Sequence, residues 1–304
     1  MYFLRRLVFA IPLVLVVSAI AFFLMHIAPG GPFDRERAPA SPEIERNLLA
    51  KYHLDEPVWK QYLRYLYGLA HGDFGPSLKY RDHSVSDIIA QGLPVSMTLG
   101  TLAFCFAMGI GLPIGFFAAA RRGGWEDYLG NAFAILAVCI PGLVIAPLLI
   151  LIVSIKLKLL PVGLWVSPAC AIMPMVALGL FFSGKIARLF REGMLSAMQS
   201  EFVMAARSKG LGETELLIRH ALRIAILPVV SYAGPMLADL LTGSFVVENI
   251  FQIPGLGVFL VNASENLDYT MVVGLALLYA VLLIGLNVFV DLAYTLLDPR
   301  VKYE

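Results

Sequence analysis

The sequence predicts an all-α integral membrane protein with six transmembrane helices. The chain of 304 residues is 59% hydrophobic and 15% charged, with a mean hydropathy of +0.79. Soluble domains contain about 45–50% apolar and about 25% charged residues. Apolar runs long enough to cross a bilayer recur along the chain, and lysines and arginines gather between particular runs, as they do in cytoplasmic loops.

The first apolar run, residues 7–28, directly follows Arg5 and Arg6. As a helix it would be about 33 Å long, enough to span a bilayer. A cleaved signal peptide is the alternative, but Pro-Gly-Gly-Pro follows the run in place of an A-x-A cleavage site. We interpret the run as a retained first span. Further spans are expected at about residues 94–120, 128–155, 168–182, 227–247 and 271–292.

A polar segment, residues 30–92, separates the first two spans. Ser41-Pro-Glu-Ile-Glu is typical of a capped helix start, and residues 58–70 have helical spacing. Their aromatic residues fit either a membrane interface or packing among themselves. The segment is too short and too polar for an independent enzyme domain. The predicted organisation is an N-terminal helix (1–29), a small extracytoplasmic cap (30–92), a five-helix membrane domain (93–298) and a cytoplasmic tail (299–304).

Lysine and arginine positions predict the orientation. If the N-terminus is cytoplasmic and six spans alternate, the basic residues outside the cap fall on the cytoplasmic side, except Lys156 and Lys158. Long extracytoplasmic segments weigh little in this rule. Both termini and the segment 201–228 are therefore expected in the cytoplasm.

Residues 201–228 form a polar, basic island between two spans. Ala205 and Ala206 offer a close approach to a helix backbone, and Gly210 can adopt the left-handed conformation that ends a helix. A second short helix fits residues 213–223, with acidic residues in its first turn and basic residues in its last, which complements the helix dipole. Such an element is shaped to fit a groove on another protein. An ordinary basic cytoplasmic loop is the alternative.

This island resembles the coupling loop, or EAA loop, of ABC importer permeases, whose pattern is Glu-Ala-Ala, three residues, Gly and a later Leu-Pro. Met204 stands in the Glu position, whereas the two alanines and Gly210 match and Leu227-Pro228 closes the motif. The long spacing to Pro228 is similar to the peptide-importer branch. The resemblance implies the six-helix fold of type I ABC importer permeases. It also implies ATPase coupling by Glu201, Ala205, Ala206, Lys209, Gly210 and Leu211, and a hinge at Pro228.

A second motif, Glu248-Asn-Ile-Phe-Gln-Ile-Pro-Gly-Leu-Gly257, follows the fifth span. Its spacing fits a connecting loop or an outer gate. It is similar to the Val-Glu-x-Ile-Phe-x-x-Pro-Gly-x-Gly signature of peptide, nickel and glutathione importer permeases, which implies a gate. The family continues with Arg-Asp-Tyr-Pro, but this chain has Leu267-Asp-Tyr-Thr270. The gate candidates are Glu248, Phe251, Pro254, Gly255, Gly257 and Phe259.

Other candidate sites are few. Asp239 lies in the middle of the fifth span. It is expected to line the path or bind a cationic group of the cargo, or else to hold spans together by an internal hydrogen bond. Residues 179–186 match most of a P-loop, but Ile186 replaces the Ser or Thr that binds magnesium, and no strand is expected before it. We predict no catalytic residue, no metal site and no cofactor. Cys105, Cys139 and Cys170 are interpreted as small buried hydrophobic residues.

The resemblance extends from the first span to the last residues, and residues 52–88 look most similar to the B-type permease subunit of bacterial oligopeptide importers. It implies a permease subunit that forms half of the path for oligopeptides across the bacterial cytoplasmic (inner) membrane, with dipeptide, glutathione or nickel as alternative cargo. The implied partners are a second related permease subunit, two ATPase subunits, an extracytoplasmic peptide-binding protein, the peptide substrate and the lipid bilayer. The net charge of +1 gives no reason to expect nucleic acid.

Two other classes remain open from the residues alone. An ion-coupled secondary transporter predicts paired carboxylates at the midplane and an inverted repeat, whereas the chain offers one such acid and no evident repeat. A membrane-embedded hydrolase needs a nucleophile and a base at one depth, and His26 and His220 are expected near opposite faces or outside them.

Overall fold

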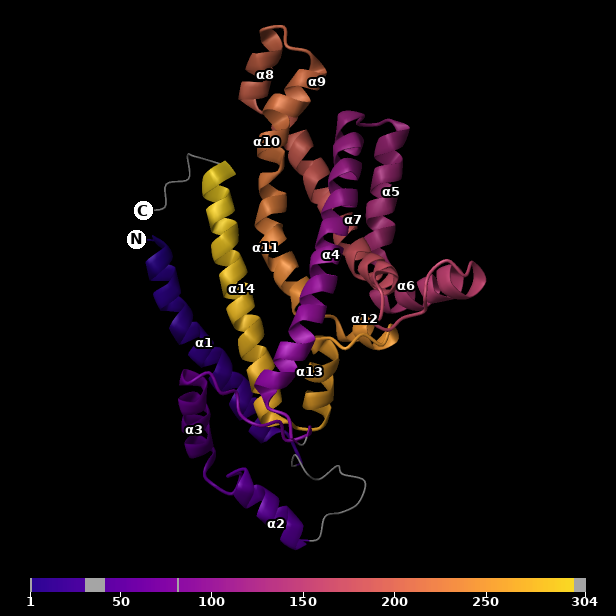
Figure 1. Cartoon of the computed structure of the whole chain (residues 1–304). Coiled ribbons are helices and arrows are strands. Elements are labelled where there is room, and N and C mark those ends of the chain that lie inside the picture. Colours follow the sequence, from indigo (N-terminus) through magenta and orange to yellow (C-terminus); the bar gives the residue numbers. More distant parts are fainter. Residues whose placement is uncertain (1, 31–41, 81, 298–304) are drawn as a thin grey trace. The chain divides into compact units, whose positions relative to one another are not determined.

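The computed structural model describes residues 2–30, 42–80 and 82–297. Its elements there are helices, with one isolated antiparallel bridge between Pro76 and Ser84 (Figure 1). The all-α prediction is confirmed for this part of the chain. The predicted helix cap at Ser41 and the tail 299–304 lie outside the described residues. By internal contacts the chain forms two compact units, residues 1–95 with 255–284 and residues 96–254 with 285–304.

The first unit gathers helices from both ends of the chain. They are α1 (Tyr2–Ile27), α2 (Pro42–Lys51), α3 (Val58–Ala70), the start of α4 (Val85–Ala120), α13 (Leu256–Glu265) and the start of α14 (Tyr269–Leu297). One buried cluster contains Val85, Ile88, Leu256, Ala263, Met271 and Leu275, and another contains Phe22, Tyr65, Val273 and Leu277. The predicted helix at 58–70 is confirmed with those bounds.

A buried carboxylate fixes the loop before α4 to the start of α14. Asp268 is fully buried and accepts hydrogen bonds from the hydroxyl of Ser77, the Lys79 N–H (3.1 Å), the Thr270 hydroxyl (3.1 Å) and the Met271 N–H (3.2 Å). Asp268 belongs to the Leu-Asp-Tyr-Thr stretch in which the family's Arg and Pro are missing. Asp268, one of the two residues retained in that stretch, has a structural role, because its carboxylate accepts hydrogen bonds from donors of both segments.

The second unit is organised around α7 (Ile172–Met198). Its other elements are the rest of α4, α5 (Trp125–Cys139), α6 (Gly142–Leu149), η1 (Ile150–Lys156), η2 (Pro168–Ala171), α8 (Glu201–Ser208), α9 (Glu213–Glu215), η3 (Leu216–Ala221), α10 (Leu222–Ala225), α11 (Leu227–Leu241), α12 (Phe245–Ile250) and the end of α14. Buried residues of α7, among them Ile186, Phe190 and Met194, share one cluster with residues of α4, α10 and α11.

Five helical stretches of the described chain are long and apolar enough to cross a membrane, and a bent pair of helices brings the number to six. The five are Ala10–Ile27, Val85–Ala120, Pro168–Met198, Leu227–Ile250 and Tyr269–Phe289, and the bent pair is Trp125–Cys139 with Gly142–Lys156. The six-span prediction is confirmed when the pair counts as one span.

The third span, expected at about 128–155, consists of two helices with a bend of 100° between them. The bend follows from Pro141, which has no backbone N–H and disfavours helical geometry in the residue before it. Ile140 accordingly adopts an extended conformation (φ −86°, ψ 118°), and Pro141 starts the next helix.

Glycines bring α4 and α7 together at two positions. A Cβ atom on Gly111 would lie 2.7 Å from the carbonyl oxygen of Ser183, and one on Gly115 would lie 2.5 Å from that of Ala187. A Cβ on Gly109 would meet nothing within 4 Å. Gly109 is exposed, so a side chain at this position would not press on another described helix.

Gly115→Ala is expected to destabilise the protein, because the added methyl group must push α4 away from the α7 backbone. Overpacking of this kind costs roughly 1–3 kcal/mol. Thermal unfolding of the purified protein in detergent measures the effect. Gly109→Ala is the matched control, and it is expected to retain or raise stability because alanine favours a helix by about 1 kcal/mol over glycine. An equal loss in both variants would contradict the close contact.

Candidate coupling site

Two helical stretches joined by a glycine turn form the segment predicted to be the coupling loop. The first is α8, and the second continues from Glu213 through η3 to Ala225. Gly210 lies between them with φ of +86°, in the left-handed conformation expected after a helix end. The predicted helix–glycine–helix geometry is confirmed, and its second helix runs on to Ala225 instead of ending at 223. Figure 1 shows α8 and α9 at the end of α10.

The segment from α8 to α10, here called the arm, has a small hydrophobic core of its own. Val203 and Ala206 of α8 are buried against Leu216 of η3, and Leu211 packs against them. Ala206 therefore faces inward, whereas Ala205 is exposed. The two alanines of the motif have different surroundings, since consecutive helix positions point about 100° apart.

The exposed face of α8 is partly apolar. Phe202 and Met204 are exposed large hydrophobic side chains, and Glu201, Ala205 and Lys209 are exposed beside them. The motif comparison marked Met204 only as a departure, and it missed Phe202. The sequence did contain a signal for an exposed Phe202. Phe202 and Val203 are neighbours in one helix, so their side chains point to different sides of it.

An ion pair spans the glycine turn. Arg207 donates from Nε and from a terminal nitrogen to the two carboxylate oxygens of Glu213, at 2.8 and 3.0 Å. Both side chains are exposed, so the pair contributes at most about 1 kcal/mol. Its two parallel hydrogen bonds favour one orientation of α8 relative to α9.

The arm meets α7 at a very short backbone distance. A Cβ atom on Gly193 of α7 would lie 2.7 Å from the carbonyl oxygen of Ala225, the last residue of α10. Pro228 follows in the first turn of α11, where the missing N–H leaves no helical bond broken. Because α10 is held against α7 just before this proline, α7 and the arm are mechanically linked at that point.

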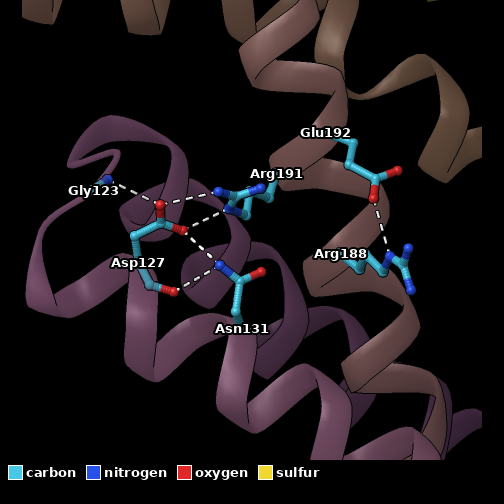
Figure 2. Close-up of polar contacts among 6 residues, drawn as sticks. All are labelled: Gly123, Asp127, Asn131, Arg188, Arg191 and Glu192. Carbon is cyan, nitrogen blue, oxygen red and sulfur yellow. Dashed lines mark hydrogen bonds and ion pairs between the residues drawn. The ribbon is translucent and has the colours of Figure 1, made fainter.

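A bidentate ion pair joins the start of α5 to α7 (Figure 2). Arg191 donates from Nε to Oδ1 of Asp127 at 2.6 Å and from a terminal nitrogen to Oδ2 at 2.9 Å. The Gly123 N–H and the Asn131 side-chain amide add bonds of 3.0 and 2.8 Å to the same carboxylate. The Asp127 side chain is 9% exposed and that of Arg191 is 20% exposed. Sequence reasoning missed this pair, because its partners lie far apart in the chain.

The gate candidates of the second unit are mostly buried. Glu248 is fully buried and accepts a hydrogen bond of 2.9 Å from the Ser96 hydroxyl. Phe251 is also fully buried, and its carbonyl oxygen accepts the N–H of Leu164 at 2.7 Å. Pro254 is exposed. In this conformation Glu248 and Phe251 hold α12 to neighbouring segments of the unit.

The other gate candidates belong to the first unit. Gly255 and Gly257 are buried at the start of α13, and Phe259 is half-buried with its ring edge-on to Tyr80, 5.6 Å between centroids. Gly257 and Phe259 thus lie within α13, which covers Leu256–Glu265. The gate role of all these residues remains a prediction.

Asp239 lies in the last turn of α11 and in the middle of the fifth span, Leu227–Ile250, as predicted. It lines a cavity of about 340 Å³ with residues of α6, α7 and α12, among them Leu143, Phe181 and Val247. The cavity gives its carboxylate a space in which a polar group can be bound. Whether Asp239 has a pathway role remains a prediction.

The P-loop-like stretch and the three cysteines have the following surroundings. The stretch 179–186 lies inside α7, so it lacks the strand–loop–helix frame of a phosphate site. Cys170 is buried as predicted, but Cys105 and Cys139 are exposed. The prediction was wrong for these two because the outer surface of a membrane helix is as apolar as its core. The described residues contain no group of three or more metal-ligating side chains.

Comparison with known families decides the class of protein. Residues 111–303 match the family described as the binding-protein-dependent transport system inner membrane component, and residues 1–100 match the N-terminal part of such membrane components. The chain belongs to this family. It is an inner-membrane transport component, and the predicted class of permease is confirmed.

Relatives of this inner-membrane component align along nearly its whole length. The oligopeptide transport system permease protein OppB of Haemophilus influenzae is 42% identical, with 98% of both chains covered. OppB of Salmonella typhimurium is 44% identical, with 99% of both chains covered. The dipeptide transport system permease protein DppB of Bacillus subtilis is 40% identical and covers 99% of this chain and 97% of its own length.

Solved structures of ABC transporters share the fold. An inward-facing MetNI methionine ABC transporter matches with a TM-score of 0.56 at 16% identity, over 69% of this chain and 96% of the other. An amino acid ABC transporter crystallised with histidines matches with a TM-score of 0.52 at 21% identity, over 68% and 93%. The fold expected from the resemblance, that of an ABC importer permease, is confirmed.

Proposed function

We propose that the chain is the permease subunit of an ATP-driven importer and forms half of the path that oligopeptides take across the bacterial cytoplasmic membrane. The observation that carries this proposal is the identity of 40–44% with permeases of oligopeptide and dipeptide transport systems over 97% or more of each chain. The alignments cover 99% of this chain, so they include the polar segment before α4 and the loops between the spans. The likeness is therefore not limited to apolar spans.

In this proposal the arm formed by α8 to α10 receives the movement of ATPase subunits. The exposed edge of α8, with Phe202, Met204 and Ala205, enters a groove on the ATPase, and Glu201 and Lys209 contact the rim of the groove. Ala206 and Leu211 act from inside the arm by holding α8 on η3. The close contact of Gly193 with Ala225 supports transmission of the movement to α7. Pro228 is the point where α11 turns relative to the arm.

The complete importer contains this chain, a second related permease, two ATPase subunits that hydrolyse ATP and an extracytoplasmic peptide-binding protein. The arm and both termini face the cytoplasm, as the distribution of basic residues predicts. Residues 248–259 act at the outer end of the path, and Asp239 binds cationic groups of passing peptides. The cavity beside Asp239 supports that role.

Co-purification and ATPase assays test the proposed function. The chain is expected to co-purify with the second permease and the ATPase pair. Binding protein loaded with oligopeptides is then expected to raise ATP hydrolysis and to drive peptide uptake into proteoliposomes. The proposal would be refuted if loaded binding protein left the rate of ATP hydrolysis unchanged, or if the chain took up peptide without any ATPase subunit.

Dipeptides are a second candidate cargo, favoured by the 40% identity with the dipeptide permease of Bacillus subtilis. The same assay separates the two candidates when di- and pentapeptides are compared at equal occupancy of the binding protein. A larger rate with pentapeptides supports oligopeptide import, and a larger rate with dipeptides assigns the chain to dipeptide import.

A further inference from the structure

The helix α3 belongs to the segment predicted as an extracytoplasmic cap, yet its inner face packs on a membrane span. The rings of Tyr62 and Tyr65 lie 5.2 and 6.1 Å from the ring of Phe22 in α1. Gln61 also contacts α1, through a bond of 3.1 Å between its side-chain oxygen and Nε2 of His26. Tyr65 is buried, and α3 is therefore fixed to α1 along much of its length.

The contacts between α3 and α1 extend from the C-terminal end of α1 toward the middle of the first span. The Tyr62 hydroxyl lies 2.8 Å from the Ser18 hydroxyl and donates to the carbonyl oxygen of Leu15 at 3.2 Å. The apolar run of the first span covers residues 7–28, and at 1.5 Å per residue Ser18 lies about 15 Å from the C-terminal end of this run. Half of a bilayer core is about 15 Å thick. The hydroxyl group of Tyr62 thus reaches almost to the bilayer centre.

The last span gives an independent measure of the same depth. Val273 and Leu277 of α14 share one buried cluster with Phe22 and Tyr65. Since α14 starts at Tyr269, Leu277 lies about 12 Å along it. Contacts with two different spans therefore place the inner face of α3 within one leaflet, the leaflet that contains the C-terminal half of α1.

The outer face of α3 is apolar and has no partner among the described residues that buries it. Trp59, Leu63 and Tyr67 follow each other at intervals of one helical turn and are 61%, 55% and 70% exposed. The charged residues Lys60 and Arg64 lie on another side of the helix, where both face Glu56. A soluble cap helix would place charges, not this row, toward water.

We infer that α3 is embedded in that leaflet as an amphipathic helix, with Trp59, Leu63 and Tyr67 in contact with phospholipid acyl chains. The span on which α3 packs exposes apolar side chains itself, since Ile20, Leu24 and Ile27 are exposed on α1, as expected of a lipid-facing helix. Tryptophan and tyrosine suit the zone between acyl chains and headgroups. Lys60 and Arg64 reach the aqueous side from the same helix, as long basic side chains do at interfaces.

Spin labels at two positions of α3 test this inference in the intact importer, reconstituted in phospholipid nanodiscs. Leu63→Cys and the matched control Lys60→Cys are made in a background in which Cys105, Cys139 and Cys170 are replaced by serine. Retained ATP-driven uptake identifies folded variants. Collision rates are measured with oxygen, which partitions into acyl chains, and with a water-soluble nickel chelate.

The ratio of oxygen to nickel collisions is expected to be several-fold higher at position 63 than at position 60. Nickel access at position 63 equal to that at position 60 would place the face in water and overturn the inference. Low access of both reagents at position 63 would assign the face to a partner protein and would also overturn it.

Tryptophan fluorescence gives a second readout without changes in α3. The chain has three tryptophans, and Trp125→Phe with Trp165→Phe leaves Trp59 alone. Phospholipids brominated on their acyl chains are expected to quench Trp59 strongly. Emission unaffected by brominated lipid would contradict lipid contact. Either result leaves the proposed import function untouched, because the assay does not depend on cargo.

Discussion

Gly210→Val is expected to abolish most peptide uptake while ATP hydrolysis continues. Gly210 has φ of +86°, a conformation that costs L-residues roughly 1–2 kcal/mol and β-branched residues more. A Cβ at this position would meet nothing within 4 Å, so the effect comes from the backbone and not from a clash. The turn between α8 and α9 is expected to relax and change the direction of α8. Peptide uptake per ATP hydrolysed in proteoliposomes measures the loss.

Gly210→Asn is the matched control, since asparagine tolerates the left-handed conformation better than other residues with a side chain. It is expected to retain most of the uptake per ATP. Full uptake in Gly210→Val would show that the direction of α8 is unimportant for coupling. Equal loss in both variants would point to a need for open space at this position instead of a need for positive φ.

Arg191→Ala is expected to destabilise the membrane domain and to reduce uptake. The change leaves the Asp127 carboxylate without its bidentate partner although its side chain is only 9% exposed. Removing one member of a buried ion pair costs about 3 kcal/mol or more. The Gly123 N–H and Asn131 amide stay in contact with the carboxylate and limit the loss. Thermal unfolding in detergent and uptake in proteoliposomes are the two measurements.

The neighbouring pair of Arg188 and Glu192 supplies the control (Figure 2). Its side chains are 72% and 56% exposed, and the single bond is 3.0 Å long. An exposed pair of this kind contributes at most about 1 kcal/mol. Arg188→Ala is therefore expected to unfold close to the parent temperature. If Arg191→Ala and Arg188→Ala lost the same stability, the ion pair between Asp127 and Arg191 would contribute no more than an exposed pair.

Much of the architecture could be predicted because the signals for it are local. Apolar runs mark the spans, and the helix–turn–helix shape of the arm follows from Gly210 together with the charge pattern at residues 213–223. The family motifs added the likeness to ABC importer permeases, which the comparisons confirm. The bend in the third span was also local, since it follows from Pro141, but a proline inside an apolar run does not by itself predict its angle.

Features that depend on tertiary contacts could not be predicted. The Asp127–Arg191 pair needs the register of α5 against α7, which no spacing in the sequence provides. The different surroundings of Ala205 and Ala206 depend on the position of Leu216. Polarity assigned residues 58–70 to a cap, but it gave no sign that Tyr62 of this helix contacts Ser18 and Leu15 of α1. Exposed cysteines were missed because hydrophobic sequence does not separate lipid-facing from buried positions.

Photo-cross-linking from α8 tests most directly whether the arm is driven by an ATPase. A benzophenone amino acid is placed at position 202 or 204, both exposed on α8, in the intact importer. The control position is 166, which is 81% exposed in the loop between the third and fourth spans and is expected on the extracytoplasmic side. Illumination is expected to link positions 202 and 204 to an ATPase subunit and to leave position 166 unlinked to it. An ATPase cross-link from position 166, with none from 202 or 204, would contradict a cytoplasmic coupling arm.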